Sequence, residues 1–345
     1  MRRLPQTIPQ ARPISVSGFG RVRRRLSAGD GRWRRASALA GLLLAGAVLI
    51  FDGASAFDGA PGDDAVARGE YIARAAGCVG CHTDHKNGGV PLAGGRALKS
   101  PYGVFYSPNI TPDTMHGIGD WSDDDFVRAL RHGRSPSGRT YYPAFPYPAY
   151  TGMSERDMLD LKAWLFAQPP VPTENRAHGI RFPFSWRFSL YPWRWFFFGA
   201  GRHDVPIEAP AEVQRGAYLV EVLGHCGECH TPRNMVGGLK VARPFAGTRY
   251  GPEGGLVPNI TPDAATGIGG WSEADLVFFF RTGLKPDGDD VTGEMREVIE
   301  DGLSRLTDGD LKAMAAYLMQ LQPIENAVRR ARKAAAAPVE DAWWD

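Results

Sequence analysis

The pentapeptide Cys-x-x-Cys-His occurs twice in this chain of 345 residues, as CVGCH at 78–82 and as CGECH at 226–230. The two copies use all four cysteines of the chain. Three kinds of chemistry use this pattern: a redox-active disulfide, a zinc site, and thioether attachment of a haem. In each case the fold must build the same chemistry at two places.

The residues around the two pentapeptides also recur. RGEYIARAAGCVGCHT returns as RGAYLVEVLGHCGECHT with one inserted residue, and SPNITPDTMHGIGDWSDDDFVRALRHG returns as VPNITPDAATGIGGWSEADLVFFFRTG. An internal repeat of this length predicts two homologous domains in tandem. The predicted divisions are an Arg-rich leader at 1–56, domain 1 at 57–175, an aromatic and arginine-rich linker at 176–207, domain 2 at 208–325 and a tail at 326–345.

Each repeat predicts three helices joined by long loops. The first helix precedes the pentapeptide, where apolar residues recur at helical spacing. The middle and final helices each begin at a hydroxyl residue followed by an acid three residues later, which is the pattern of an N-cap. These pairs are Ser122 with Asp125, Ser272 with Asp275, Ser154 with Asp157, and Thr307 with Asp310. No stretch shows sustained strand alternation, so the fold is predicted to be mainly helical.

Of the three chemistries, haem attachment accounts for most of the pattern. A disulfide leaves the histidine unexplained and predicts a thioredoxin-like context, which the sequence lacks. Zinc asks for four ligands, and each repeat offers Cys, Cys and His without an evident fourth. Two cysteines one helical turn apart can form thioethers to a haem, with the adjacent His82 or His230 as iron ligand. The macrocycle also fills the thin core left by short helices and loops rich in glycine and proline.

Taken together, CxxCH, PNITPD, GIGxWS and the final helix resemble class I cytochrome c domains, in particular the cytochrome c subunits of membrane-associated sugar, alcohol and aldehyde dehydrogenases. The resemblance covers 57–325 and implies two tandem helical domains, each wrapped around one covalent haem c. The attachment and ligand residues that it implies are Cys78, Cys81, His82, Cys226, Cys229 and His230. It also implies electron transfer from a dehydrogenase to a further cytochrome or an oxidase.

The sixth iron ligand is expected to differ between the repeats. In the second, the loop PDGDDVTGEMREVIEDGLSRL contains one Met and no His, and Met295 matches the family's ligand position. In the first, Phe145 occupies the place where some relatives have Met, and phenylalanine cannot bind iron. Related sequences with AFPY often carry a Met just before the final helix, which points to Met153. Weaker candidates are His132, Met115 and His116, whereas Met158 is expected in the core.

Two functional hypotheses follow from this difference. The leading one is a two-haem electron carrier without substrate chemistry of its own, with two distinct midpoint potentials. The alternative is a haem enzyme such as a di-haem peroxidase, in which Phe145 leaves the first iron open to small ligands.

For several other residues the sequence leaves two roles open: contact with a haem, or a structural role in the fold. Asn109, Thr111, Asn259 and Thr261 are expected either to hold a haem propionate or to form turns, and Trp121 and Trp271 either to contact a propionate or to fill the core. Arg128, Arg131 and Arg281 either neutralise propionates or lie on solvated helix faces.

The N-terminal region predicts export. Ten arginines in the first 56 residues precede an uncharged apolar run at 36–51 and the small residues Ala54-Ser55-Ala56, which is typical of a signal peptide cleaved after Ala56. A retained membrane anchor is the alternative. The expected location is the periplasm, either soluble or anchored to the outer face of the inner membrane.

The net charge of the chain and the composition of the linker indicate which partners are expected. Net charge is only +2 and the chain after the leader is mildly acidic, which excludes a typical nucleic-acid binder. The segment 176–206 interleaves phenylalanine, tyrosine and tryptophan with arginine. Such a segment is expected either to pack between the domains or to contact a partner or the membrane.

Overall fold

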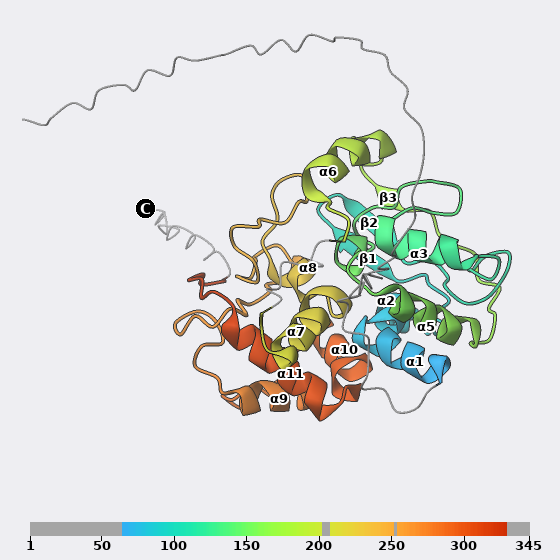
Figure 1. The fold of residues 1–345 in the computed structure, drawn as a ribbon. Coiled ribbons are helices and arrows are strands. Elements are labelled where there is room, and N and C mark those ends of the chain that lie inside the picture. The colour runs from blue at the N-terminus through green and yellow to red at the C-terminus, as the bar shows by residue number, and fades with distance from the viewer. Residues whose placement is uncertain (1–63, 202–207, 252–253, 330–345) are drawn as a thin grey trace, which may run out of the picture. The chain divides into compact units, whose positions relative to one another are not determined.

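A computed structural model describes residues 64–201, 208–251 and 254–329, and this part of the chain is mainly helical (Figure 1). The predicted leader at 1–56 and residues 330–345 of the predicted tail lie outside the described residues. In the first half the elements are α1 (Ala65–Ala75), α2 (Cys78–Cys81), β1 (Ala97–Ser100), β2 (Gly103–Tyr106), α3 (Asp123–His132), α4 (Tyr147–Tyr150) and α5 (Glu155–Phe166). In the linker they are β3 (Gly179–Ile180) and α6 (Leu190–Phe197), and in the second half α7 (Ala211–Ala217), the π-helical turn η3 (Tyr218–Leu223), α8 (Cys226–His230), α9 (Glu273–Thr282), α10 (Glu294–Asp301) and α11 (Asp308–Gln320).

The predicted N-caps begin the middle and final helices of both halves. The side chains of Ser122 and Ser272 accept hydrogen bonds from the aspartate N–H three residues later, and each aspartate accepts in return from the cap N–H. This reciprocal arrangement satisfies two free donors of the helix end. Ser154 and Thr307 also accept from the aspartate N–H at the start of α5 and α11. The four predicted starts are therefore confirmed.

The first and last helices of each half cross closely at a glycine. Helix α1 packs on α5, and α7 packs on α11. A Cβ atom at Gly69 would lie 1.9 Å from the carbonyl oxygen of Asp160, and one at Gly216 would lie 1.9 Å from that of Ala313. No larger residue fits while the backbones stay at this separation. The same crossing therefore anchors both halves.

The residue inserted before the second pentapeptide is absorbed by the π-helical turn η3. The N–H of Gly224 donates to the carbonyl oxygen of Leu219, five residues earlier, over 2.7 Å. A π turn accommodates one extra residue within a helix, so the insertion is taken up before the separate helix of the pentapeptide begins at Cys226. The residue before the first cysteine has a positive φ in both halves, 65° at Gly77 and 38° at His225.

A small antiparallel sheet with the order β1-β2-β3 takes two strands from the first half and one from the linker. Leu98 of β1 pairs with Phe105 of β2, and Val104 of β2 pairs with Gly179 of β3. The sequence did not predict these strands, because segments of two to four residues are too short to show an alternating pattern. Since β3 belongs to the linker, the linker is hydrogen-bonded to the first half.

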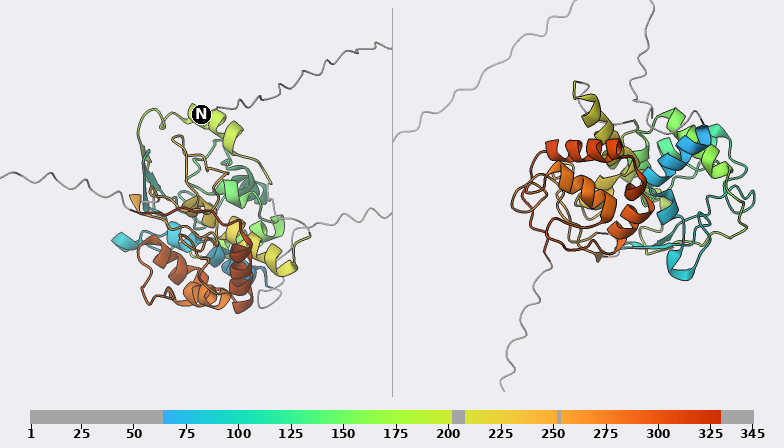
Figure 2. Two further views of the ribbon diagram at one scale, coloured as in Figure 1. Left: turned by 90° about the vertical axis from the view of Figure 1, so that its left-hand side faces the viewer. Right: turned by 90° about the horizontal axis from the view of Figure 1, so that it is seen from below.

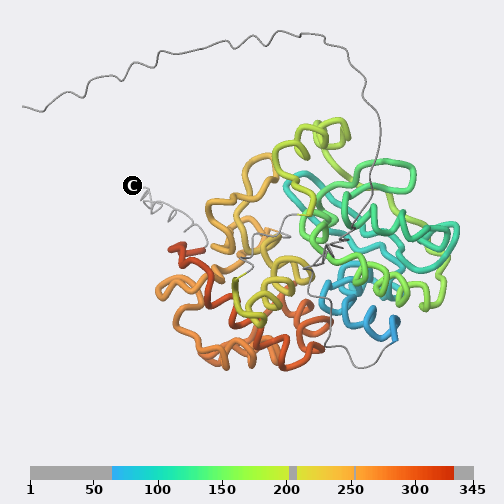
Figure 3. The backbone as a smooth tube through the Cα atoms, in the orientation of Figure 1, coloured from blue at the N-terminus to red at the C-terminus, as the bar shows by residue number. Residues whose placement is uncertain are grey.

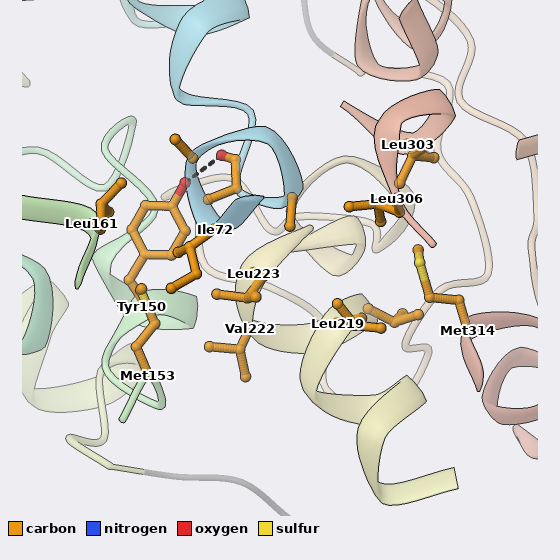
Figure 4. Close-up of a cluster of buried hydrophobic side chains, with 14 of the residues drawn as sticks. Ile72, Tyr150, Met153, Leu161, Leu219, Val222, Leu223, Leu303, Leu306 and Met314 are labelled. Carbon is orange, nitrogen blue, oxygen red and sulfur yellow. Dashed lines mark hydrogen bonds between the residues drawn. The ribbon is translucent and has the colours of Figure 1, made fainter. Parts of the chain in front are cut away.

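One hydrophobic cluster extends through both halves. It joins Ile72 and Leu161 of the first half to Leu219, Leu223 and Met314 of the second (Figure 4). Helix α1 contacts η3 directly, and the backbone trace shows these two segments meeting near the centre of the described chain (Figure 3). The view from below shows the same junction between the two halves (Figure 2). The two pentapeptides are thus carried by helices that share one core.

Candidate haem-binding sites

Each pentapeptide forms one short helix, which brings its two cysteines onto one face. Helix α2 begins at Cys78 and ends at Cys81, and α8 begins at Cys226 and includes Cys229. Residues three apart in a helix are neighbours on its surface. Burial raises the pKa of the Cys78, Cys226 and Cys229 thiols to about 12.

Within the described residues, no group of three or more His, Cys, Asp or Glu side chains is placed to hold a metal ion. The two sites therefore lack the ligand set that the zinc hypothesis requires.

The histidine of each pentapeptide is oriented by a backbone carbonyl. Nδ1 of His82 lies 2.8 Å from the carbonyl oxygen of Pro108, and Nδ1 of His230 lies 2.9 Å from that of Pro258. A carbonyl oxygen only accepts, so Nδ1 carries the proton and Nε2 keeps its lone pair for a metal. Burial lowers the pKa of both histidines, which favours this neutral form. Sequence reasoning did not assign this role to the two prolines.

The asparagines and threonines after these prolines use their side chains within the protein. Nδ2 of Asn109 donates to the carbonyl oxygens of Val171 (2.7 Å) and Thr173 (3.1 Å), while its Oδ1 accepts from the backbone N–H and the hydroxyl of Thr111. Asn259 makes the same bonds to Thr261 in the second half. The structural interpretation of these four residues is therefore favoured over propionate binding.

The arginines and tryptophans considered for propionates also have protein partners. Arg128 pairs with Asp125 at 2.9 Å, Arg131 with Glu155 at 3.8 Å and Arg281 with Asp308 at 2.6 Å. Trp121 and Trp271 are partly buried and pack against the shared core. These contacts favour the structural role for all five residues.

Both attachment helices line one cavity of about 600 Å³. Cys81 and Cys229 both border it, and its wall is largely aromatic and aliphatic. An apolar cavity with a few convergent polar groups is the usual form of a cofactor site. The paired cysteines and the unprotonated Nε2 atoms fit attachment of a haem at each pentapeptide, and the cavity borders one cysteine of each pair but neither histidine.

The loop between the middle and final helices supplies the candidates for the sixth ligand. The backbone bond from Tyr141 to Gly133 in the first half matches the bond from Val291 to Gly283 in the second. Phe145 and Met295 each follow four residues later and are structurally equivalent positions. Met295 is half-buried on α10 and packs against the shared core.

In the first half, Phe145 is surrounded by other aromatic rings. Its ring lies 5.7 Å from that of Tyr141 and 5.9 Å from that of Tyr150. Met153 is 2% exposed and lies beside Tyr150 (Figure 4). Of the weaker candidates, Met115 is 83% exposed, His116 and His132 are half-buried, and Met158 is fully buried in the core as expected.

The linker turns one face to the protein and the other to solvent. On the inner side, Leu190 packs with Phe105 and Tyr142, and Phe197 contacts Gly238 of the second half. The outer side carries large exposed side chains: Phe182, Trp186, Phe188, Tyr191, Trp195 and Phe196. We call Trp186, Phe188, Tyr191 and Trp195 the aromatic ridge. Its first three rings adjoin at centroid distances of 5.4 and 5.8 Å.

None of the helices within 64–201, 208–251 and 254–329 combines the length and the apolar character that crossing a membrane requires.

Comparison with known proteins places these features among haem proteins. A family model described as Cytochrome c matches residues 66–167. A diheme cytochrome c-type protein of Cereibacter sphaeroides is 42% identical over 262 residues, which cover 75% of this chain and 86% of that protein. The gluconate 2-dehydrogenase cytochrome c subunit of Pantoea cypripedii is 42% identical over 271 residues, covering 75% of this chain and 60% of that subunit.

The cytochrome c subunit of a quinone alcohol dehydrogenase from Gluconobacter oxydans is 39% identical over 301 residues, covering 85% of this chain and 60% of that subunit. The chain thus spans about 60% of the length of these two dehydrogenase subunits.

Proposed function

Because the chain belongs to the cytochrome c family and transfers electrons with two covalently attached haem c groups, we propose that it carries electrons from a periplasmic or membrane-associated dehydrogenase to a downstream acceptor of the respiratory chain. The observation that supports this most is the cavity that both attachment helices line. Two attachment helices that border the same apolar cavity suit electron passage within one molecule. The haem irons supply the one-electron chemistry.

In this proposal each half holds one haem with its own residues. Cys78 and Cys81 attach the first haem and Cys226 and Cys229 the second. His82 and His230 bind iron through Nε2, because the carbonyl oxygens of Pro108 and Pro258 hold the proton on Nδ1. The sixth ligands are Met295 in the second half and Met153 in the first.

The donor and acceptor are proposed from the relatives. The gluconate and alcohol dehydrogenase proteins are named as cytochrome c subunits, and they resemble this chain over 75% and 85% of its length. A dehydrogenase is therefore the proposed donor, and a further cytochrome or an oxidase is the proposed acceptor. In this assignment the chain has no substrate reaction of its own.

We also propose that the aromatic ridge contacts the membrane on the periplasmic side. Tryptophan and tyrosine gather where proteins meet lipid headgroups. The segment 176–201 contains neither aspartate nor glutamate, and two of its four arginines, Arg176 and Arg181, are exposed, so it complements anionic headgroups. Trp195 is 85% exposed, and the ridge does not line the cavity between the halves.

Vesicle binding tests the membrane contact. The double variant Tyr191→Ser/Trp195→Ser is expected to bind vesicles containing anionic lipid at least about tenfold more weakly, because each exposed aromatic contributes roughly 1.5 kcal/mol or more on burial. Phe278→Ser, which removes a 53%-exposed aromatic on α9, serves as the matched control. Unchanged vesicle binding of the double variant rejects the membrane contact. The contact is also rejected if the double variant loses only its binding to a dehydrogenase subunit.

The electron-carrier assignment is tested by spectra of the oxidised protein, a redox titration and an assay with added peroxide. Two low-spin haems, two midpoint potentials and no turnover of added peroxide are expected. A high-spin signal together with peroxide turnover supports the alternative peroxidase and overturns the carrier assignment. Phe145 motivates this alternative, since its side chain cannot bind iron at the position equivalent to Met295.

A further inference from the structure

Each half of the molecule places one tyrosine hydroxyl on the start of the final helix of the other half. Tyr71 of α1 lies at the start of α11: its hydroxyl accepts from the N–H of Thr307 (2.9 Å) and donates to Oδ2 of Asp310 (2.7 Å). Tyr218 of η3 lies at the start of α5. Its hydroxyl accepts from the N–H of Ser154 (3.3 Å) and donates to Oδ2 of Asp157.

These contacts replace a bond that the middle helices make locally. In α3 and α9 the aspartate accepts directly from the N–H of the capping serine, as between Asp275 and Ser272 at 2.8 Å. In α5 and α11 the tyrosine hydroxyl stands between the same two groups, accepting from the cap N–H and donating to the carboxylate. The starts of both final helices are thus completed by the opposite half.

The tyrosine hydroxyls are suited to this bridging role. Burial together with the Asp310 carboxylate raises the pKa of Tyr71 to about 12, and burial together with Asp157 raises that of Tyr218 further still. Both hydroxyls therefore keep their protons at neutral pH and donate to the aspartates. Asp157 is 0% and Asp310 9% exposed, so water does not compete freely for these bonds.

The bridging tyrosines stand on the helical segments that lead into the pentapeptides. Tyr71 lies in α1, which ends three residues before Cys78, and Tyr218 begins η3, which ends three residues before Cys226. Within the first half, the hydroxyl of Tyr150 donates to the carbonyl oxygen of Ala76 (2.8 Å), which fixes the end of α1 close to Cys78. Holding these segments against the opposite final helix fixes where each pentapeptide lies.

From this arrangement we infer that Tyr71 and Tyr218 are positioning residues that hold the two haem-binding halves in one fixed relation. The inference rests on the proposed function, since it assigns the tyrosines a role in setting the geometry between two haem sites. Neither tyrosine is proposed as an iron ligand or as a carrier of electrons.

The test compares the haem-loaded double variant Tyr71→Phe/Tyr218→Phe with wild type. Hydrogen exchange at the N–H groups of Ser154 and Thr307 is expected to become about fivefold faster, because each loses a bond worth roughly 1 kcal/mol. In circular dichroism, the paired Soret bands that arise from two haems held at a fixed angle are expected to weaken. The absorption spectrum of each haem stays unchanged.

Tyr317→Phe is the matched control, because Tyr317 donates to Glu221 within the second half. It removes the same chemistry without touching the junction and is expected to leave both readouts at wild-type values. If the double variant does not fold, Tyr71→Phe alone is measured, and faster exchange at Thr307 with wild-type exchange at Ser154 is expected.

Wild-type exchange and an unchanged Soret pattern in a folded variant overturn the inference. Failure of the proposed function is a separate result, because protein without bound haem shows no Soret signal in wild type or variant, whereas exchange at the helix starts still reports on the tyrosines.

Discussion

The two halves keep the same attachment side and differ in the loop between their middle and final helices. Both hold a pentapeptide histidine against a proline carbonyl. In the second half the loop forms α10 and presents Met295, whereas in the first it forms the single turn α4 and presents Phe145 among tyrosines. The repeat therefore preserves the attachment residues and varies the loop from which we propose the sixth iron ligands, which predicts two unlike redox sites.

Removing Met295 is expected to have the largest effect on this contrast. Met295→Leu should abolish the Met–iron absorption of one haem and lower its midpoint potential by a sizeable part of the range of about 0.8 V that axial ligands span. Phe145→Leu is the matched control at the equivalent position and should change neither potential. A redox titration with unchanged midpoints in Met295→Leu would contradict the ligand assignment; Met153→Leu tests the other haem in the same way.

The glycine crossings test where the halves are alike. Gly69→Ala and Gly216→Ala should each destabilise the protein by about 3 kcal/mol or more, because the added Cβ would overlap a helix carbonyl oxygen. Thermal unfolding measures both, and Gly270→Ala, where a Cβ meets nothing within 4 Å, is the control. A tolerated substitution at one glycine alone would show that the two helix crossings are not equivalent.

The aspartates bridged by the tyrosines test where the halves differ. Arg215 binds both carboxylate oxygens of Asp310 at 2.8 Å, whereas Arg68 binds Asp160 instead of Asp157. Asp310→Asn should therefore cost about 3 kcal/mol by removing the carboxylate partner of a half-buried arginine. Asp157→Asn should change stability by only about 1 kcal/mol in either direction. Equal losses in denaturant unfolding would contradict this asymmetry.

A smaller effect of pH follows from Asp157. Burial raises the pKa of Asp157, while Tyr218, Ser154 and Arg215 oppose the rise and Asp160 adds to it. The fold thus favours the neutral acid, and this contribution is lost as pH rises from the ordinary pKa of 3.8 through the raised one. Asp157→Asn should gain stability relative to wild type over that window. A constant difference between the two proteins from acid to neutral pH would show that Asp157 does not titrate this way.

The sequence predicted the local features well because their causes are local. The four N-caps and the two pentapeptides each depend on a few neighbouring residues. The one-residue insertion was visible in the repeat, but its accommodation as a π turn at Tyr218–Leu223 depends on how η3 must reach the pentapeptide. The domain boundaries, including those of the linker at 176–207, stay predictions.

The features that the sequence did not predict depend on contacts between distant segments. One tyrosine bridge joins Tyr71 to Thr307 and Asp310, which lie 236 and 239 residues later in the sequence. No local sequence pattern indicates such a contact. The proline carbonyls that orient His82 and His230 act through the backbone, so side-chain identity gives little signal. Asn109 and Asn259 donate to the carbonyl oxygens of Val171 and Ile324, which lie 62 and 65 residues later in the sequence, so no local pattern indicates these bonds.

Covalent attachment of two haems is tested most directly by the intact mass and Soret absorbance of the purified protein. The protein is expected to be coloured, with a mass that exceeds that of its polypeptide by two haem groups. Cys78→Ser/Cys81→Ser and Cys226→Ser/Cys229→Ser are each expected to remove one of them. A folded, colourless protein with the mass of the polypeptide alone would contradict covalent haem attachment.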